Sequence, residues 1–274
     1  MKRYVIISDG LGNQMFQYAF LLALRAKGFP VIGDVSLFQR AKMHNGFELK
    51  DVFKIKDDFI SRNSLNLLFL RCLLTIKICP LLKFDNNRYD ESIYTKWHLI
   101  YRGYWQDSRY FQDVENIVRK AFSFMNIDSH TKSIAEQMMG KNSVSLHIRR
   151  GDYVGHPQVE SICNEEYYRT AISLLKSKVI EPFFYIFSDD LNWANTFIKS
   201  MDVKYRLVEG NQGANSYKDM FLMTQCKHHI IANSTFSWWG AWLNPNKDKI
   251  VIAPKTWSMG NHHLRPQLNE WFLI

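Results

Sequence analysis

The feature that most constrains the fold is a regular alternation of apolar and amphipathic stretches in the second half of the chain. The apolar runs predict strands and the longer segments between them predict helices. The expected strands are 143–148, 182–187, 205–208, 229–232 and 250–253, and the expected helices are 165–178, 191–199, 217–226 and 235–243. This spacing predicts a parallel, doubly wound sheet, and such α/β sheets bind ligands at the carboxyl ends of their strands.

The N-terminal segment has the same order of strand, turn and helix. Residues 4–7 predict a buried strand, and residues 13–27 have helical periodicity. The turn between them resembles a dinucleotide-binding loop but lacks the third glycine of GxGxxG, so the pattern alone is weak. We expect two units, an N-terminal one at 1–142 and a C-terminal one at 143–274. The C-terminal tail is a candidate to pack back on the first unit.

The net charge of +9 favours anionic partners such as phosphorylated substrates or anionic lipid. Nucleic acid is not expected, because the chain has neither zinc-finger spacing nor an Arg/Lys-rich arm. None of the four cysteines forms a CxxC pair, so we expect no bound metal.

The apolar stretch at 65–82 is interrupted by charged residues and a proline, so it does not reach the length of a membrane span without charge. It predicts a core or interdomain helix, with a surface helix that touches lipid as the alternative. The N-terminus contains no apolar run long enough for a signal peptide. We therefore expect a cytoplasmic protein, with peripheral contact at the inner face of the membrane left open.

Two arginines follow the expected strand at 143–148. Arg149 and Arg150 are costly to bury unless they meet anions, and a guanidinium matches the geometry of a phosphate. The alternative is a structural pair between Arg150 and Asp152, and both interpretations are compatible.

Two carboxylates, Asp189 and Asp190, follow the expected strand at 182–187. They could hold a divalent metal, but capping of the next helix or orientation of an arginine is favoured.

A third cluster covers 232–240, where small hydroxyl residues begin a helix. The free N–H groups of a helix start bind anions, although Ser234 could also be an ordinary N-cap. Aromatic residues at 97–110, including Tyr101, Tyr104 and Trp105, could stack on sugars or belong to the core.

Together these segments resemble the bacterial α-1,2-fucosyltransferases of glycosyltransferase family 11. The family signature GGLGNQMFQYA corresponds to residues 9–19, its HxRRGDY motif to 147–153, its FSDD-like segment to 187–190 and its ANSTFSWWGAWL segment to 232–243. Asp9 stands where the family often has the first glycine. The resemblance implies a GT-B-like fold, with two Rossmann-type halves facing a cleft, an N-terminal half for the acceptor and a C-terminal half for GDP-fucose.

The resemblance also implies roles for individual residues. Arg149 would bind the β-phosphate, Arg150 and Asp152 would hold the loop, and Asp189 and Asp190 would belong to the donor site. His147 and Asp219 would recognise the nucleoside. Asn13, next to Gln14 in the Gly-Asn-Gln turn, would reach the fucose or a phosphate. The diphosphate would be lined by Asn233, Ser234, Thr235 and Phe236.

The implied reaction is transfer of L-fucose from GDP-β-L-fucose to a hydroxyl, foremost the 2-hydroxyl of a galactose in an oligosaccharide or lipid-linked glycan. A β-linked donor and an α-linked product require inversion, without metal or cofactor. Arg149 would stabilise the leaving GDP. The base that takes the acceptor proton is open among His156, Glu160 and Asp9. A fucosyltransferase of another linkage and a non-catalytic nucleotide-sugar-binding protein are the alternatives.

Overall fold

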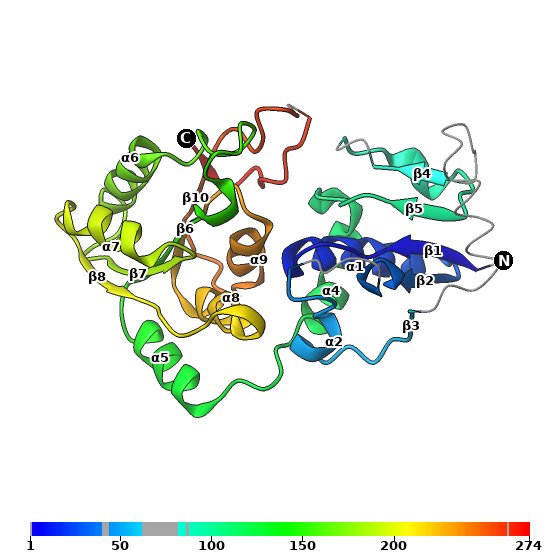
Figure 1. Ribbon diagram of the computed structural model, residues 1–274, viewed down its shortest axis with the longest axis horizontal. Helices are drawn as coiled ribbons and strands as arrows, with labels where there is room; N and C mark the ends of the chain where they lie inside the picture. Colours follow the sequence, from blue (N-terminus) through cyan, green and yellow to red (C-terminus); the bar gives the residue numbers. More distant parts are fainter. Residues whose placement is uncertain (1, 40–43, 62–81, 86–87, 262) are drawn as a thin grey trace. The chain divides into compact units, whose positions relative to one another are not determined.

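The computed structural model describes residues 2–39, 44–61, 82–85, 88–261 and 263–274. The chain forms two compact units, Met1–Met125 and Asn126–Ile274, and each is built on its own parallel sheet (Figure 1). This division precedes the boundary expected at 142/143. The reason is helix α5 (Ser129–Met139), whose Ile134 and Met138 belong to an apolar core of the second unit.

Within the described residues, the first unit has five strands in the order β3-β2-β1-β5-β4. The strands are β1 (Arg3–Ile6), β2 (Val31–Asp34), β3 (Phe59–Ile60), β4 (Leu82–Phe84) and β5 (Ile100–Arg102). The helices are α1 (Leu11–Ala26), α2 (Leu49–Val52) and α4 (Glu115–Ala121), with 3-10 turns η1 (Ser36–Gln39), η2 (Glu91–Tyr94), η3 (Ser108–Tyr110) and η4 (Gln112–Val114). Helix α1 packs on β1 and β2. Since β2 and β5 flank β1 on opposite sides, the carboxyl end of β1 is a switch point of this sheet.

The described residues of the second unit form six strands in the order β11-β10-β9-β6-β7-β8. The strands are β6 (Ser143–Ile148), β7 (Phe183–Ser188), β8 (Lys204–Leu207), β9 (His228–Ile230), β10 (Val251–Ala253) and β11 (Phe272–Leu273). The further helices are α6 (Glu165–Lys176), α7 (Leu191–Lys199), α8 (Tyr217–Gln225) and α9 (Thr235–Leu243), with 3-10 turns η5 (Gly151–Tyr153) and η6 (Gly213–Asn215). The chain proceeds from β6 outward to β8 and then crosses to β9 on the other side of β6. This is the strand order of a Rossmann-type sheet, with its switch point between β6 and β9.

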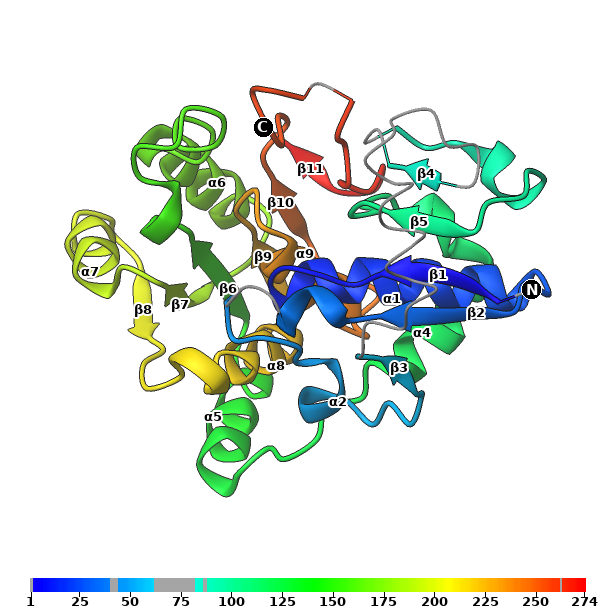
Figure 2. The ribbon, with the colours of Figure 1, turned by 45° about the vertical axis from the view of Figure 1, so that its right-hand side comes forward.

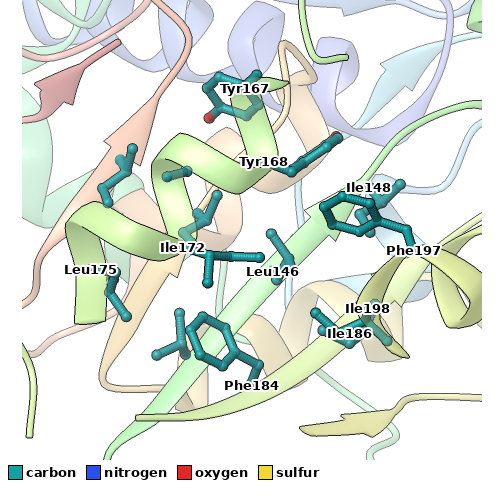
Figure 3. Packing of buried hydrophobic residues seen from close by; sticks show 14 of the residues in the cluster. Leu146, Ile148, Tyr167, Tyr168, Ile172, Leu175, Phe184, Ile186, Phe197 and Ile198 are labelled. Carbon is teal, nitrogen blue, oxygen red and sulfur yellow. The ribbon is translucent and has the colours of Figure 1, made fainter. Parts of the chain in front are cut away.

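Alternating side chains of the strands bury the two faces of this second sheet. Phe184 and Ile186 of β7 meet α6 and α7 on one face, where Figure 3 shows Ile172 and Phe197 packed beside them. Tyr185 and Phe187 face the opposite side, in a core with α5 and α8. A strand buried on both faces reads as a continuous apolar run, which explains the sequence of β7. This packing fixes the strand ends that carry the polar clusters.

The predicted α/β class is confirmed, and β6, α7 and α9 have the bounds expected from the sequence. The end of the chain forms β11, which pairs with β10 in the second sheet (Figure 2). The last residues therefore belong to the sheet of the second unit.

Most of the apolar stretch expected at 65–82 lies outside the described residues, so the choice between a core helix and a lipid-touching helix stays a prediction. Among the residues that the structure does describe, no helix is both long and apolar enough to cross a bilayer.

Candidate functional site

The three polar clusters predicted in the second unit lie at one edge of its sheet. Strand β6 pairs in parallel with β7, with Ile148 opposite Ser188, and pairs with β9 on its other side. The loops that begin at Arg149, Asp189 and Ile231 therefore leave three neighbouring strands at the same edge. Ligand sites of open α/β sheets occur at this edge and at this switch point.

Arg149 forms ion pairs with two carboxylates. Its Nη2 atom lies 2.6 Å from Oδ1 of Asp152, and its Nη1 atom lies 2.8 Å from Oδ2 of Asp189. The Tyr153 ring centroid is 5.4 Å from the guanidinium carbon. The alternative interpretation, a structural pair between Arg150 and Asp152, is therefore wrong, because Asp152 pairs with Arg149. In the 3-10 turn η5, Asp152 is directed back to Arg149 instead.

Arg150 contacts residues at the start of α7. Its Nε atom is 3.3 Å from Oδ2 of Asp190, and its guanidinium carbon is 4.3 Å from the ring centroid of Trp193. Its backbone N–H donates to Oδ1 of Asp189 at 2.8 Å. Arg150 thus braces the loop after β6 against the start of α7.

Asp189 and Asp190 have separate structural partners. Asp190 is the N-cap of α7, because its Oδ1 accepts the backbone N–H of Trp193 at 3.0 Å. Asp189 bridges the Arg149 side chain and the Arg150 backbone. These are the contacts of the capping and orientation interpretation. Across the described part of the chain, no three His, Cys, Asp or Glu side chains form a group that could hold a metal ion.

His147 is the last buried polar residue of β6 before the arginines, with 6% of its surface exposed. Its Nδ1 atom has no hydrogen-bond partner among the described residues, and its ring centroid is 6.0 Å from that of Phe236. Burial, assisted by the charge of Arg149 and opposed by Asp189, lowers the pKa of His147 to about 4. The imidazole is therefore neutral at physiological pH and presents an unsatisfied polar atom.

The loop after β9 presents a second unsatisfied atom. Asn233 is 3% exposed, its Nδ2 donates to the carbonyl of Trp257 at 3.3 Å, and its Oδ1 has no partner in the part of the chain that the structure describes. The Tyr153 hydroxyl donates to the Asn233 carbonyl at 2.9 Å and so ties this loop to η5. Buried polar atoms without partners are rare in folded proteins. His147 and Asn233 lie at the carboxyl ends of two neighbouring strands, so these two atoms together point to a ligand.

The start of α9 combines two expected features. Ser234 is the N-cap, and its Oγ accepts the N–H of Phe236 at 3.3 Å. Its hydroxyl therefore has the ordinary capping role. Thr235 and Phe236 form the first turn and are partly exposed, so the backbone of this turn is the anion-binding element that remains.

Asp219 lies in the first turn of α8 rather than at a strand end. Asn211 donates to its Oδ1 at 2.7 Å, and burial raises the pKa of Asp219 to about 7. A carboxyl group that titrates near neutrality is typical of functional sites. Its hydrogen-bond partner, Asn211, is not one of the other predicted site residues.

The base candidates His156 and Glu160 lie in the exposed loop after η5. The Nδ1 atom of His156 accepts the backbone N–H of Gln158 at 3.3 Å. This arrangement is that of a solvated loop.

In the first unit, Asp9 has a φ of +65°, the left-handed region that favours glycine. This is the position where the family signature quoted above has glycine.

The next residues of the turn contact the rest of the first unit. Asn13 accepts a hydrogen bond from Nε2 of Gln106 at 2.8 Å. Gln14 is fully buried and bonded on both sides, donating to the carbonyls of Asp9 and Gly46 and accepting from the N–H of Glu48. Gln14 thus holds the turn, and its contacts are with the protein backbone.

Sequence reasoning missed Gln106, whose contact with Asn13 joins residues far apart in the chain. The aromatic segment at 97–110 was the nearby signal. Tyr101 and Trp105 of that segment are fully buried and belong to the core, whereas Tyr104 is exposed.

A model of glycosyl transferase family 11 matches residues 2–274. An α-1,2-colitosyltransferase of Escherichia coli is 35% identical over 92% of this chain and 90% of its own length. The mouse galactoside 2-α-L-fucosyltransferase Sec1 is 28% identical over 97% of this chain and 72% of its own.

Among solved structures, the α-1,6-fucosyltransferase NodZ co-crystallised with GDP superposes with a TM-score of 0.57. The match covers 87% of this chain and 91% of NodZ at 14% identity. This likeness shows the fold, which is GT-B-like.

Proposed function

The chain belongs to glycosyl transferase family 11, and on that premise we propose that it transfers L-fucose from GDP-β-L-fucose to the 2-hydroxyl of a galactose in a glycan. The observation that carries the proposal is the cluster of Arg149, the unsatisfied Asn233 and the start of α9 on neighbouring strand ends. Both relatives named above are described as forming linkages to position 2, which supports an α-1,2 product.

We propose that the nucleotide lies at the switch point between β6 and β9. Arg149 and the first turn of α9 would take the diphosphate, because a guanidinium and free helix N–H groups both bind phosphate oxygens. His147, which is neutral, would bind the nucleoside together with Asp219. The unpartnered Nδ1 of His147 and Oδ1 of Asn233 would gain hydrogen bonds on binding.

The proposed chemistry is one displacement with inversion. The acceptor hydroxyl attacks the anomeric carbon, the bond from this carbon to the β-phosphate oxygen of GDP breaks, and a base takes the hydroxyl proton. Arg149 stabilises the negative charge that develops on GDP, and Asp189 and Asp152 hold the guanidinium in place. We propose that no metal is needed, since both carboxylates after β7 are already engaged by arginines.

We further propose a cytoplasmic enzyme that meets a lipid-linked or soluble glycan. The net charge of +9 supports peripheral contact with anionic lipid. Binding to anionic vesicles that persists in high salt would contradict an electrostatic contact.

A second candidate function is transfer of colitose, which is fucose without its 3-hydroxyl. The 35% identity with the colitosyltransferase favours it. Competition between GDP-fucose and GDP-colitose for one acceptor distinguishes the two donors.

The test is GDP release from GDP-fucose in EDTA with galactose-terminated acceptors, for wild type, Arg149→Ala and Arg169→Ala. Arg169 is the control, because it pairs with Glu165 on α6 in the same unit. We expect turnover by wild type and the control, and a loss of about 100-fold or more in kcat for Arg149→Ala.

Turnover that appears only after a divalent metal is added would overturn the metal-free mechanism. GDP binding without turnover on any acceptor would favour the non-catalytic alternative. Competition by UDP or CDP as strong as that by GDP would point to another nucleotide.

A further inference from the structure

The carboxyl ends of β1 and β5 are neighbours in the first sheet, with Tyr4 opposite Ile100 and Val5 opposite Tyr101. The turn after β1 and the loop after β5 therefore leave the same edge. Two buried glutamines cross-link them. Gln17 donates to the carbonyl of Gly103 at 3.1 Å, and Gln106 donates to Asn13 at 2.8 Å. The two loops form one rigid element at the switch point.

The backbone of this element is held in uncommon conformations. Asp9 and Trp105 have φ values of +65° and +55°. Gly103 has a φ of +150°, and a Cβ there would lie 2.1 Å from the Cβ of Asp85. Such conformations cost free energy and cluster at functional sites. They set Tyr104, between Gly103 and Trp105, against the turn after β1.

The side chains of Asp9 and Tyr104 meet in this element. The Asp9 carboxylate accepts from the Ser8 hydroxyl at 3.1 Å. Burial and the nearby Asp9 carboxylate raise the pKa of Tyr104 to about 12, so its hydroxyl stays protonated. Tyr104 nevertheless keeps 39% of its surface exposed, whereas its neighbour Trp105 is fully buried. An exposed ring beside an oriented carboxylate is thus available at the switch point.

We propose that Asp9 and Tyr104 form a subsite for the galactose of the acceptor, with the ring of Tyr104 stacked on the sugar and the Asp9 carboxylate accepting a sugar hydroxyl. This inference rests on the proposed function and names the substrate contact in the first unit. One face of a galactopyranose carries C–H groups, which pack on an aromatic ring, while its hydroxyls need acceptors. A few oriented polar groups beside an aromatic surface are what such a site requires.

The test measures binding of lactose to the GDP-saturated full chain by saturation-transfer NMR. Tyr104→Ala should weaken lactose binding about 10-fold, and Tyr104→Phe, which keeps the ring, should weaken it less. Trp97→Ala is the matched control, because Trp97 is another exposed aromatic of this unit, at 44%. GDP affinity, measured by calorimetry, should be the same in all four proteins.

Lactose that binds Tyr104→Ala as well as wild type, or does not bind wild type, overturns the subsite. Equal weakening by Trp97→Ala does the same. Failure of the proposed function looks different, since lactose would then bind through Tyr104 while wild type transfers no fucose to it.

Discussion

The Oδ2 atom of Asp189 lies 2.6 Å from the place that a Cβ would occupy on Gly151. The same oxygen is 2.8 Å from Nη1 of Arg149. A glycine is therefore required between the paired arginines and Asp152, because any side chain would displace the carboxylate that positions Arg149.

Gly151→Ala should move Asp189 and loosen Arg149. Displacement of a positioned group by about 1 Å costs up to about 100-fold in rate, so we expect a loss in kcat of about 10- to 100-fold. Steady-state kinetics measures it. Gly140→Ala is the control, because a Cβ there comes no closer than 3.7 Å to another atom. A Gly151→Ala enzyme as active as that control would contradict this role for the glycine.

Gln106 is expected to act through Asn13, whose Oδ1 it engages. Gln106→Met removes the donor and leaves the Asn13 amide free to rotate, so kcat should fall about 10-fold, the equivalent of one neutral hydrogen bond. Gln106→Glu can donate only while its carboxyl group is protonated. Its kcat, normalised to wild type at each pH, should therefore rise as the pH falls.

The pH dependence of kcat shows whether Gln106 orients the Asn13 side chain or has only a structural role. Gln106→Met should show no recovery at low pH, and Gln112→Glu, an exposed position in the same unit, should match wild type throughout. Parallel pH profiles for Gln106→Met and Gln106→Glu would show that Gln106 does not orient Asn13.

The meeting of the three polar clusters of the second unit could be predicted from the sequence, because parallel strands bring their carboxyl ends to one edge. The partner of Asp152 could not. Residue spacing permits a pair with either arginine, and only the 3-10 geometry of η5 selects Arg149.

The first unit was less predictable for a related reason. Its decisive contacts, such as Gln106 with Asn13, join loops that only the pairing of β1 with β5 brings together. Composition likewise could not separate the buried Trp105 from the exposed Tyr104, since both are aromatic residues in one short segment.

Asp219 should make donor binding pH-dependent. Guanine offers N–H donors, which an ionised carboxylate accepts. With a pKa of about 7, only about a tenth of Asp219 is ionised at pH 6, so affinity for GDP-fucose should be about 10-fold lower there than at pH 8. GDP-fucose is the suitable probe, because its diphosphate does not titrate near neutrality. Calorimetry should give a flatter profile for Asp219→Asn.

The folding stability of the ligand-free protein gives an independent check on the pKa of Asp219. It should fall as the pH rises, whereas the affinity for GDP-fucose should increase. The folded pKa of about 7 exceeds the usual value of 3.8. The stabilisation by protonated Asp219 is therefore present below pH 3.8 and is lost as the pH rises through about 7. Without ligand, Asp219→Asn should gain stability relative to wild type between pH 5 and pH 8 in urea titrations. If the difference in stability between Asp219→Asn and wild type is the same at pH 5 and pH 8, Asp219 is ionised over this whole range.

The base can be identified from three variants that remove charge with little change of shape. We expect Asp9→Asn to lower kcat about 100-fold, the usual range for loss of a general base. Asn also tolerates the left-handed backbone at this position, so folding should be preserved. His156→Gln and Glu160→Gln should stay near wild type, because both side chains are exposed in a solvated loop. If His156→Gln instead lowers kcat by this factor while Asp9→Asn stays near wild type, the base lies in the loop after η5 and Asp9 serves only to hold the sugar.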